Sequence, residues 1–190
     1  MAQRIGLVLA GGLGRRFGRP KGELLLEGTT LAARAACTLW PLCGSVLISL
    51  SPDGANPAPG FAAVHDEPPA GRGPLAGIAA GFRATGSADL LVLACDYPRV
   101  GADLLQALVG APGAHDLAIV SDPSGRDHPL VGLWRRSAES MVRRALEEGA
   151  YKVRGVLREI QVKRLRATQL PGLDWGHALQ NWNAPEDAVP

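Results

Sequence analysis

The sequence predicts an α/β protein, a three-layer α/β/α sandwich with a Rossmann-like, mostly parallel sheet. Strand-like and helical segments alternate along the chain, which is typical of parallel sheets whose strands are connected by helices. Leu90–Ala94 is an uninterrupted apolar run, as in a central strand that is covered on both faces. The chain has 190 residues without a linker or an internal repeat, so we expect a single domain.

Apolar runs and capping residues mark the elements before this central strand. Thr29 or Thr30 suits the N-cap of a helix that ends near Pro41. Pro74 suits the first turn of the next helix, where its missing N–H is not needed. The predicted elements are strands at Arg4–Ala10, Val46–Leu50 and Ala62–His65, and helices at Thr30–Leu42 and Pro74–Arg83.

The alternation continues after the central strand. Gly149 suits the end of a helix that begins near Ser137, and the segment from Pro171 onward has little pattern. The predicted elements are helices at Ala102–Val109, Ser137–Glu148 and near Val153–Glu159, and strands at Leu117–Val120, Leu130–Arg135 and near Val162–Arg166.

The composition excludes several classes of function. Hydrophobic residues make up 46% and charged residues 20% of the chain, as in a globular protein, and the net charge of +2 is too small for a nucleic-acid surface. No apolar run reaches the roughly 18 residues of a transmembrane helix, and the first residues lack the layout of a signal peptide. We therefore expect a cytoplasmic protein with no nucleic-acid or membrane partner. The three cysteines have no C-x-x-C spacing, which favours buried thiols over disulfides or a zinc site.

A glycine-rich loop follows the first predicted strand. The segment Leu7–Lys21 contains four glycines, two adjacent arginines and a lysine. Glycines let the backbone come close to a ligand, successive N–H groups can form an anion-binding nest, and cations complement phosphate. The pattern favours a nucleoside triphosphate site, although a glycine-rich turn whose arginines face water also fits these residues. Neither G-x-G-x-x-G nor G-x-x-x-x-G-K-[ST] can be written over Gly11–Gly22.

Ligands of such sheets bind beyond the carboxyl ends of the strands, so the loops after Ala10, Leu50, His65 and Ala94 should line one crevice. Asp96 follows the central strand, and its carboxylate oxygens are ligands of the kind that Mg²⁺ prefers. The same carboxylate can equally well stabilise a turn before Pro98.

Three further segments contain candidate site residues that can also be explained without a functional role. Asp66-Glu67 can be a solvated acidic pair, and the glycines of 71–77 can be spacing before a helix. Arg126-Asp127-His128-Pro129 can be a surface turn closed by an Asx bond. A Ser-His-Asp hydrolase has little support, because no G-x-S-x-G elbow is present.

Leu9–Lys21 matches L-A-G-G-x-x-x-R-x-G-x-x-K, which resembles the signature of nucleotidylyltransferases that transfer NMP from an NTP. More specifically, the chain is similar to the molybdenum cofactor guanylyltransferases of the MobA-like nucleotidyltransferase family. The resemblance extends through five motifs in order, to about Asp187. The other four are Asp66 with the G-P-L-A-G of Gly73–Gly77, the C-D-x-P of Cys95–Pro98, the R-D-H-P of Arg126–Pro129, and the N-x-N-x-P-E-D of Asn181–Asp187.

The resemblance implies roles for individual residues. The family's aspartate at the Asp96 position binds the catalytic metal, here expected to be Mg²⁺, and Arg15, Lys21 and Asp96 are the expected catalytic residues. The nucleotide would be bound in the N-terminal half, about 1–100, and the acceptor in the C-terminal half, about 101–190. The expected nucleotide-binding residues are Leu9, Ala10, Gly11, Gly12, Lys21, Asp66, Gly73 and Asp96, and the expected acceptor-binding residues are Arg126, His128, Asn181 and Asn183.

Three departures from the family pattern stand out. Ser49-Leu50-Ser51 lacks an asparagine that some members place near the nucleotide, Tyr97 fills a position that is usually smaller, and Ala184 replaces the usual threonine.

The activity that the resemblance implies is Mg²⁺-dependent transfer of GMP from GTP to the terminal phosphate of molybdopterin, with release of pyrophosphate. Other proteins of molybdenum cofactor biosynthesis would be its partners. The residues Ala10-Gly11-Gly12 favour GTP, because related cytidylyltransferases tend to have A-A-G there. Two alternatives stay open: a related nucleotidylyltransferase with another base or acceptor, of the cytidylyltransferase or sugar-phosphate type, and a non-catalytic GTP-binding paralogue.

Overall fold

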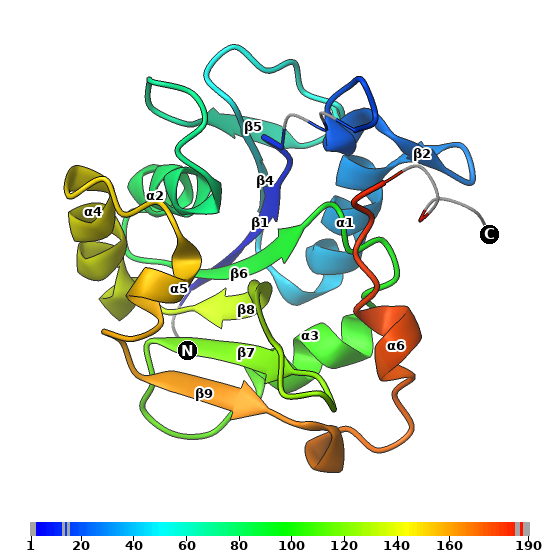
Figure 1. Cartoon of the computed structure of the whole chain (residues 1–190), viewed down its shortest axis with the longest axis vertical. Helices are drawn as coiled ribbons and strands as arrows, with labels where there is room; N and C mark the ends of the chain where they lie inside the picture. Colours follow the sequence, from blue (N-terminus) through cyan, green and yellow to red (C-terminus); the bar gives the residue numbers. More distant parts are fainter. Residues whose placement is uncertain (1–2, 13, 15, 185–186, 188–190) are drawn as a thin grey trace.

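The computed structural model describes residues 3–12, 14, 16–184 and 187, and its centre is a seven-stranded sheet (Figure 1). The strand order is β5-β4-β1-β6-β8-β7-β9. Only β8 runs antiparallel to its neighbours, so the prediction of a mostly parallel sheet is confirmed. The strands are β1 Arg4–Leu9, β4 Val46–Leu50, β5 Ala62–His65, β6 Asp89–Ala94, β7 Leu117–Ser121, β8 Asp127–Trp134 and β9 Val162–Leu165, and a separate hairpin pairs β2 Leu25–Leu26 with β3 Thr29–Thr30.

Helices cover both faces of this sheet, which confirms the three-layer sandwich (Figure 1). Helices α1 and α3 pack together on one face, while α2 packs with α4 on the other and α5 lies against α4. The helices are α1 Leu31–Leu39, α2 Pro74–Thr85, α3 Ala102–Val109, α4 Glu139–Glu147, α5 Val153–Val156 and α6 Trp175–Ala178, with short 3₁₀ turns at Lys21–Glu23, Trp40–Leu42, Arg136–Ala138 and Ala167–Gln169.

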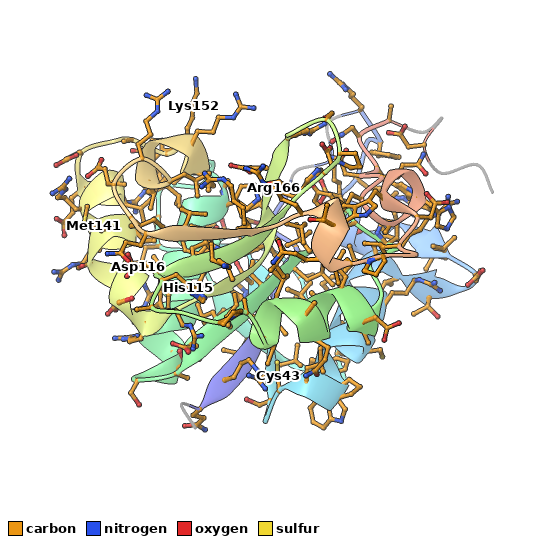
Figure 2. All side chains as sticks on the ribbon, turned by 90° about the horizontal axis from the view of Figure 1, so that it is seen from below. Cys43, His115, Asp116, Met141, Lys152 and Arg166 are labelled. Carbon is orange, nitrogen blue, oxygen red and sulfur yellow. The ribbon has the colours of Figure 1, made fainter. Side chains whose placement is uncertain are left out.

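The core confirms the reading of the central strand. Every residue of β6 is buried, and the strand contacts α1 on one face of the sheet and α2 on the other. Figure 2 draws the side chains that occupy the space between the sheet and the helices. In the part of the chain that the structure describes, no helix is long and apolar enough to cross a membrane.

Some boundaries differ from the predictions for local reasons. Strand β8 begins at Asp127 and not at Leu130, because a register shift between Ile119 and Val120 lets the polar residues 127–128 pair with β7. The first predicted helix changes to a 3₁₀ turn at Trp40–Leu42, where Pro41 has no N–H to continue the α-helix. The hairpin β2–β3 was not predicted. Helix α6 was not predicted either, because it lies in the segment from Pro171 onward, which has little pattern.

The cysteine prediction is partly wrong. All three thiols are free, but only Cys95 is buried, while Cys37 lies on the exposed side of α1 and Cys43 is half-buried. Burial raises the pKa of the Cys95 thiol and raises the pKa of Cys43 to about 11, so neither is a reactive thiolate at neutral pH.

Replacing Gly132 of β8 by alanine tests how closely the sheet is packed. A Cβ there would lie 2.7 Å from the carbonyl oxygen of Ala118 on β7, and a backbone oxygen cannot move aside cheaply. We expect Gly132→Ala to lower the free energy of unfolding by about 2 kcal/mol in urea titrations. Gly101→Ala is the control, because a Cβ there meets no atom within 4 Å. Equal stability of the two variants would contradict this packing.

Candidate active site

The loops after β1, β4, β5 and β6 meet at the carboxyl edge of the sheet and enclose a cavity of about 500 Å³. This arrangement confirms the predicted crevice. Ala10 is buried beneath the loop and lines a smaller neighbouring cavity. Arg15 lies outside the described residues. The predicted nucleotide-binding residues that line the main cavity are Leu9, Gly11, Gly12, Lys21, Asp66, Gly73 and Asp96.

The glycine loop turns back on itself at Gly14. This residue has a φ of 52°, and a Cβ would lie 2.0 Å from the Arg19 carbonyl oxygen, so only glycine fits. The Lys21 N–H donates to the Gly12 carbonyl oxygen at 3.2 Å, which closes the loop. The loop therefore brings Lys21, nine residues beyond Gly12 in sequence, back to the cavity.

Lys21 is the point where distant parts of the chain meet. Its Nζ lies 2.9 Å from Asp96 Oδ2 and 2.9 Å from Asn183 Oδ1. The Lys21 and Asp96 side chains are 18% and 19% exposed, so water screens this ion pair only partly. Sequence reasoning assigned Asn183 to the acceptor; the structure places its amide on the lysine of the glycine loop.

The C-terminal segment is held in this position by its backbone (Figure 1). The Trp182 N–H donates to the Asp96 carbonyl oxygen at 2.8 Å. The N–H groups of Asn183 and Ala184 donate to Asp187 Oδ2 at 2.7 and 2.9 Å, and these bonds lower the pKa of Asp187. Asn181 lies just before this turn and is partly exposed. A carboxylate at 187 thus caps the turn in which Ala184 replaces the family's threonine.

One carboxylate oxygen of Asp96 is left without a partner among the described residues. Its Oδ1 is buried and has no hydrogen-bond partner in the described structure, while Oδ2 is paired with Lys21. No group of three or more His, Cys, Asp or Glu side chains with metal-binding geometry occurs among the described residues. A single carboxylate with a free oxygen suits Mg²⁺, which usually binds one or two carboxylates together with water and substrate phosphates. The residues present therefore fit the expected metal.

Asp66 lies at the other end of the cavity and depends on Ser49. Burial raises the pKa of Asp66, while the Ser49 Oγ–H, which donates to its Oδ1 at 3.2 Å, and the charge of Arg83 act to lower it. Ser49 in turn needs Gly77 of the G-P-L-A-G segment, because a Cβ at position 77 would lie 2.3 Å from Ser49 Oγ. Sequence reasoning noted Ser49 and Ser51 only as departures. Both line the cavity, and their position directly at the end of β4 was the available signal.

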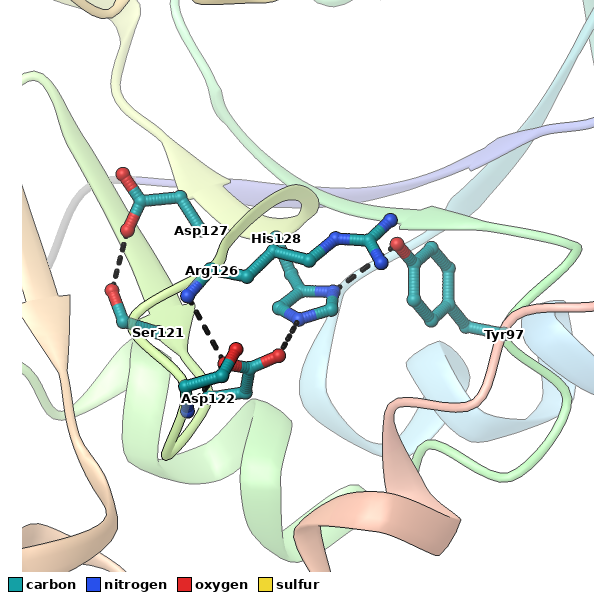
Figure 3. A network of polar contacts seen from close by, with 7 residues as sticks. Tyr97, Ser121, Asp122, Arg126, Asp127 and His128 are labelled. Carbon is teal, nitrogen blue, oxygen red and sulfur yellow. Dashed lines mark hydrogen bonds and ion pairs between the residues drawn. The ribbon is translucent and has the colours of Figure 1, made fainter.

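His128 is 3% exposed and lies inside a polar network (Figure 3). Its Nδ1 is 3.2 Å from the Tyr97 hydroxyl oxygen, and its Nε2 is 3.1 Å from Asp122 Oδ2. Both ring nitrogens are therefore engaged within the protein. Arg126 is exposed, and its N–H donates to Asp122 Oδ1 at 3.0 Å, as in an Asx-type turn. An acceptor-binding role for His128 stays a prediction, and its contacts favour holding Tyr97 next to Asp96.

Comparisons with known proteins identify the family. The model of the MobA-like NTP transferase domain matches residues 6–165. The chain belongs to the MobA-like NTP transferase family. The molybdenum cofactor guanylyltransferase of Acidiphilium cryptum is 37% identical to this MobA-like chain over 163 residues, 83% of this chain and 80% of the relative. The probable molybdenum cofactor guanylyltransferase of Chloroflexus aggregans is 36% identical over 96% of this chain and 90% of its own length.

Solved structures agree with this fold. The molybdopterin-guanine dinucleotide biosynthesis protein A of Archaeoglobus fulgidus superposes with a TM-score of 0.79 and 24% identity, over 97% of this chain and 94% of that one. Family membership makes this MobA-like chain a nucleotidyltransferase, as the glycine loop and the four later motifs predicted.

The network around His128 predicts a pH-dependent contribution to stability. Desolvation acts to raise the pKa of Asp122, but hydrogen bonds from Ser124, His128 and the Arg126 backbone lower it to about 2, below its ordinary value of 3.8. The stabilisation is therefore fully present above about pH 4 and is lost as the pH falls through about 2. Because the carboxylate is partly exposed, we expect Asp122→Asn to cost about 1 kcal/mol at pH 7.

Urea unfolding of the parent and of Asp122→Asn at several pH values measures this difference, which should shrink as the pH falls from about 4 to about 2. Asp53→Asn is the control, because Asp53 is an exposed aspartate. A difference that does not change with pH would contradict the assignment.

Proposed function

We propose that this MobA-like chain transfers GMP from GTP to the terminal phosphate of molybdopterin and releases pyrophosphate. The names of its relatives support the guanylyl transfer and its place in molybdenum cofactor biosynthesis. The observation on which the proposal depends is the ion pair of Lys21 with Asp96, whose second carboxylate oxygen is buried and has no partner among the described residues. Other proteins of the same biosynthesis as partners, and the cytoplasm as compartment, belong to the proposal on sequence grounds.

The order of the strands suggests how the nucleotide lies. Asp66 follows β5 and Asp96 follows β6, and these strands are three positions apart in the sheet. Three strand spacings amount to about 14 Å, comparable to the length of an extended nucleoside triphosphate. The nucleoside therefore lies near Asp66 and Ser49, and the triphosphate lies near Lys21 and Asp96. Gly11 lies along this path, and a Cβ there would be 3.0 Å from the Ser51 backbone nitrogen.

The chemistry needs positioning and neutralisation of charge. The ammonium of Lys21 has three donors, of which Asp96 and Asn183 receive two, so one is left for a phosphate oxygen. The glycine loop adds backbone N–H groups near the leaving pyrophosphate. Asp96 would hold Mg²⁺, which when bound neutralises charge on the phosphate oxygens. The acceptor phosphate is already ionised and attacks the α-phosphorus directly, so no protein nucleophile or general base is required.

Pyrophosphate release in the presence of molybdopterin, Mg²⁺ and either GTP or CTP tests the function. We expect kcat/KM for GTP to exceed that for CTP by about tenfold or more, or roughly 1.4 kcal/mol, because the loop at Gly11 fits closely against the end of β4. A reaction without molybdopterin is the control. Equal or faster turnover of CTP would contradict guanylyl transfer, and GTP binding without pyrophosphate release would indicate a binding protein.

Asp96→Asn tests the metal site with little change of shape. The amide keeps an oxygen near Lys21 but loses the charge that holds a divalent cation, so we expect kcat/KM to fall by about 100-fold or more. The measurement is pyrophosphate release over a range of Mg²⁺ concentrations, with thermal unfolding as a check of folding. Asp103→Asn on the exposed side of α3 is the matched control. A near-parent rate at saturating Mg²⁺ would show that Asp96 is not the metal ligand.

A further inference from the structure

A second cavity, of about 490 Å³, lies beside the first one and is lined by four arginines. Arg126 comes from the loop between β7 and β8, Arg154 from α5, Arg158 from the turn after α5, and Arg164 from β9. We call these four residues the arginine basin. Four positively charged side chains from separate segments therefore converge on one hollow, although the sequence spreads them over 39 positions.

The charge of the basin is poorly compensated. Asp127 is the acidic residue that lines it, in a chain whose net formal charge is only +2. The Nε of Arg164 lies 3.0 and 3.2 Å from the two carboxylate oxygens of Asp127. Within the described part of the chain, the guanidinium groups of Arg126, Arg154 and Arg158 have no ion pair or hydrogen bond. Like charges around a hollow repel one another, so an anion in the basin would be stabilised by all four.

The guanidinium of one of the four arginines is held in place in advance, and the backbone of a second is fixed. Asp127 accepts a hydrogen bond from Ser121 Oγ at 2.5 Å, which fixes the carboxylate that orients Arg164. Because Arg164 contacts Asp127 through Nε, its terminal N–H groups remain free for a second partner. The Arg126 backbone is fixed by Asp122 (Figure 3). Arginines held in this way bind oxyanions through two hydrogen bonds at once.

The basin lies next to the place of the proposed reaction. Consecutive residues of β8 line the two cavities: Pro129 contributes to the basin and Leu130 to the first cavity. The loop that contains Arg126 is joined through Asp122 and His128 to Tyr97, the residue that follows Asp96 (Figure 3). A molecule that spans the start of β8 can therefore reach both cavities.

We propose that the arginine basin binds an oxyanion of the acceptor substrate, apart from the triphosphate held at Lys21. This inference rests on the proposed function. Transfer requires two anionic substrates to meet, and each needs its own cations. In the proposed function Lys21 and the metal at Asp96 serve the triphosphate, whereas the basin lies on the other side of the start of β8.

The double variant Arg154→Gln/Arg158→Gln tests this proposal. Both side chains are exposed, so their replacement leaves the fold intact, while Arg126 and Arg164 are kept because their segments are tied into the structure. The control, Arg143→Gln, removes an exposed arginine from α4, which does not line the basin. Binding of molybdopterin to the GTP-free protein is followed by pterin fluorescence, and binding of GTP and of pyrophosphate by calorimetry.

We expect the basin variant to bind molybdopterin about tenfold more weakly or worse, and GTP within about twofold of the parent. Added salt should weaken molybdopterin binding more in the parent than in the basin variant. Unchanged molybdopterin binding, or an equal loss of GTP affinity, would overturn the proposal. A loss of pyrophosphate affinity alone would also overturn it, because the basin would then be a product site.

The same measurements separate this proposal from the proposed function. If the parent forms the guanylylated product and the basin variant binds molybdopterin normally, only the proposed role of the arginine basin is refuted. A parent that binds molybdopterin through the basin but releases no pyrophosphate with GTP refutes only the guanylyl transfer. A parent that neither binds nor modifies molybdopterin refutes both.

Discussion

The ion pair between Lys21 and Asp96, which both line the active-site cavity, is the place where three distant parts of the chain meet. Lys21 comes from the glycine loop, Asp96 from the end of β6, and Asn183, which also accepts from Lys21, from the C-terminal segment. Both charged side chains are less than one-fifth exposed, so the pair is stronger than a surface ion pair, and either charge alone would be costly. The Oδ1 of Asp96 is buried and has no hydrogen-bond partner among the described residues.

This arrangement depends on small residues that allow close approach. Gly14 permits the turn that returns Lys21 to the cavity, and Gly77 leaves the space in which Ser49 orients Asp66. Both positions require a residue without a side chain, because a methyl group at either would collide with atoms that shape the site. The glycine-rich motifs of this family therefore shape the site here through packing.

The helices and strands were predictable from the local sequence pattern. The site was predictable only where its residues lie in one continuous segment. The apolar run of β6 and the proline that opens α2 predicted both elements almost to the residue. The contact of Asn183 with Lys21 joins residues 162 positions apart, and periodicity gives no information on such pairs. The burial of His128 was not predicted either, because it follows from the register shift that extends β8 to Asp127 and places the ring between Tyr97 and Asp122; its acceptor-binding role stays a prediction. The arginine basin as a whole was not predicted: Arg126 was expected to bind the acceptor, but the other members are scattered along the chain among many other arginines.

The separation of the two cavities follows from the electrostatics of joining two anions. Two unit charges of the same sign that lie 4 Å apart repel by about 4 kcal/mol at an effective dielectric of about 20. Cations that neutralise only the triphosphate therefore leave the negative charge of the second substrate uncompensated. A single cluster of cations between the substrates would also attract each anion into the other's place. Strand β8 avoids this conflict, since Pro129 and Leu130 face different cavities at its start. The one antiparallel strand of the sheet thus divides the positive charge into two sites, and it leaves their meeting point next to Asp96.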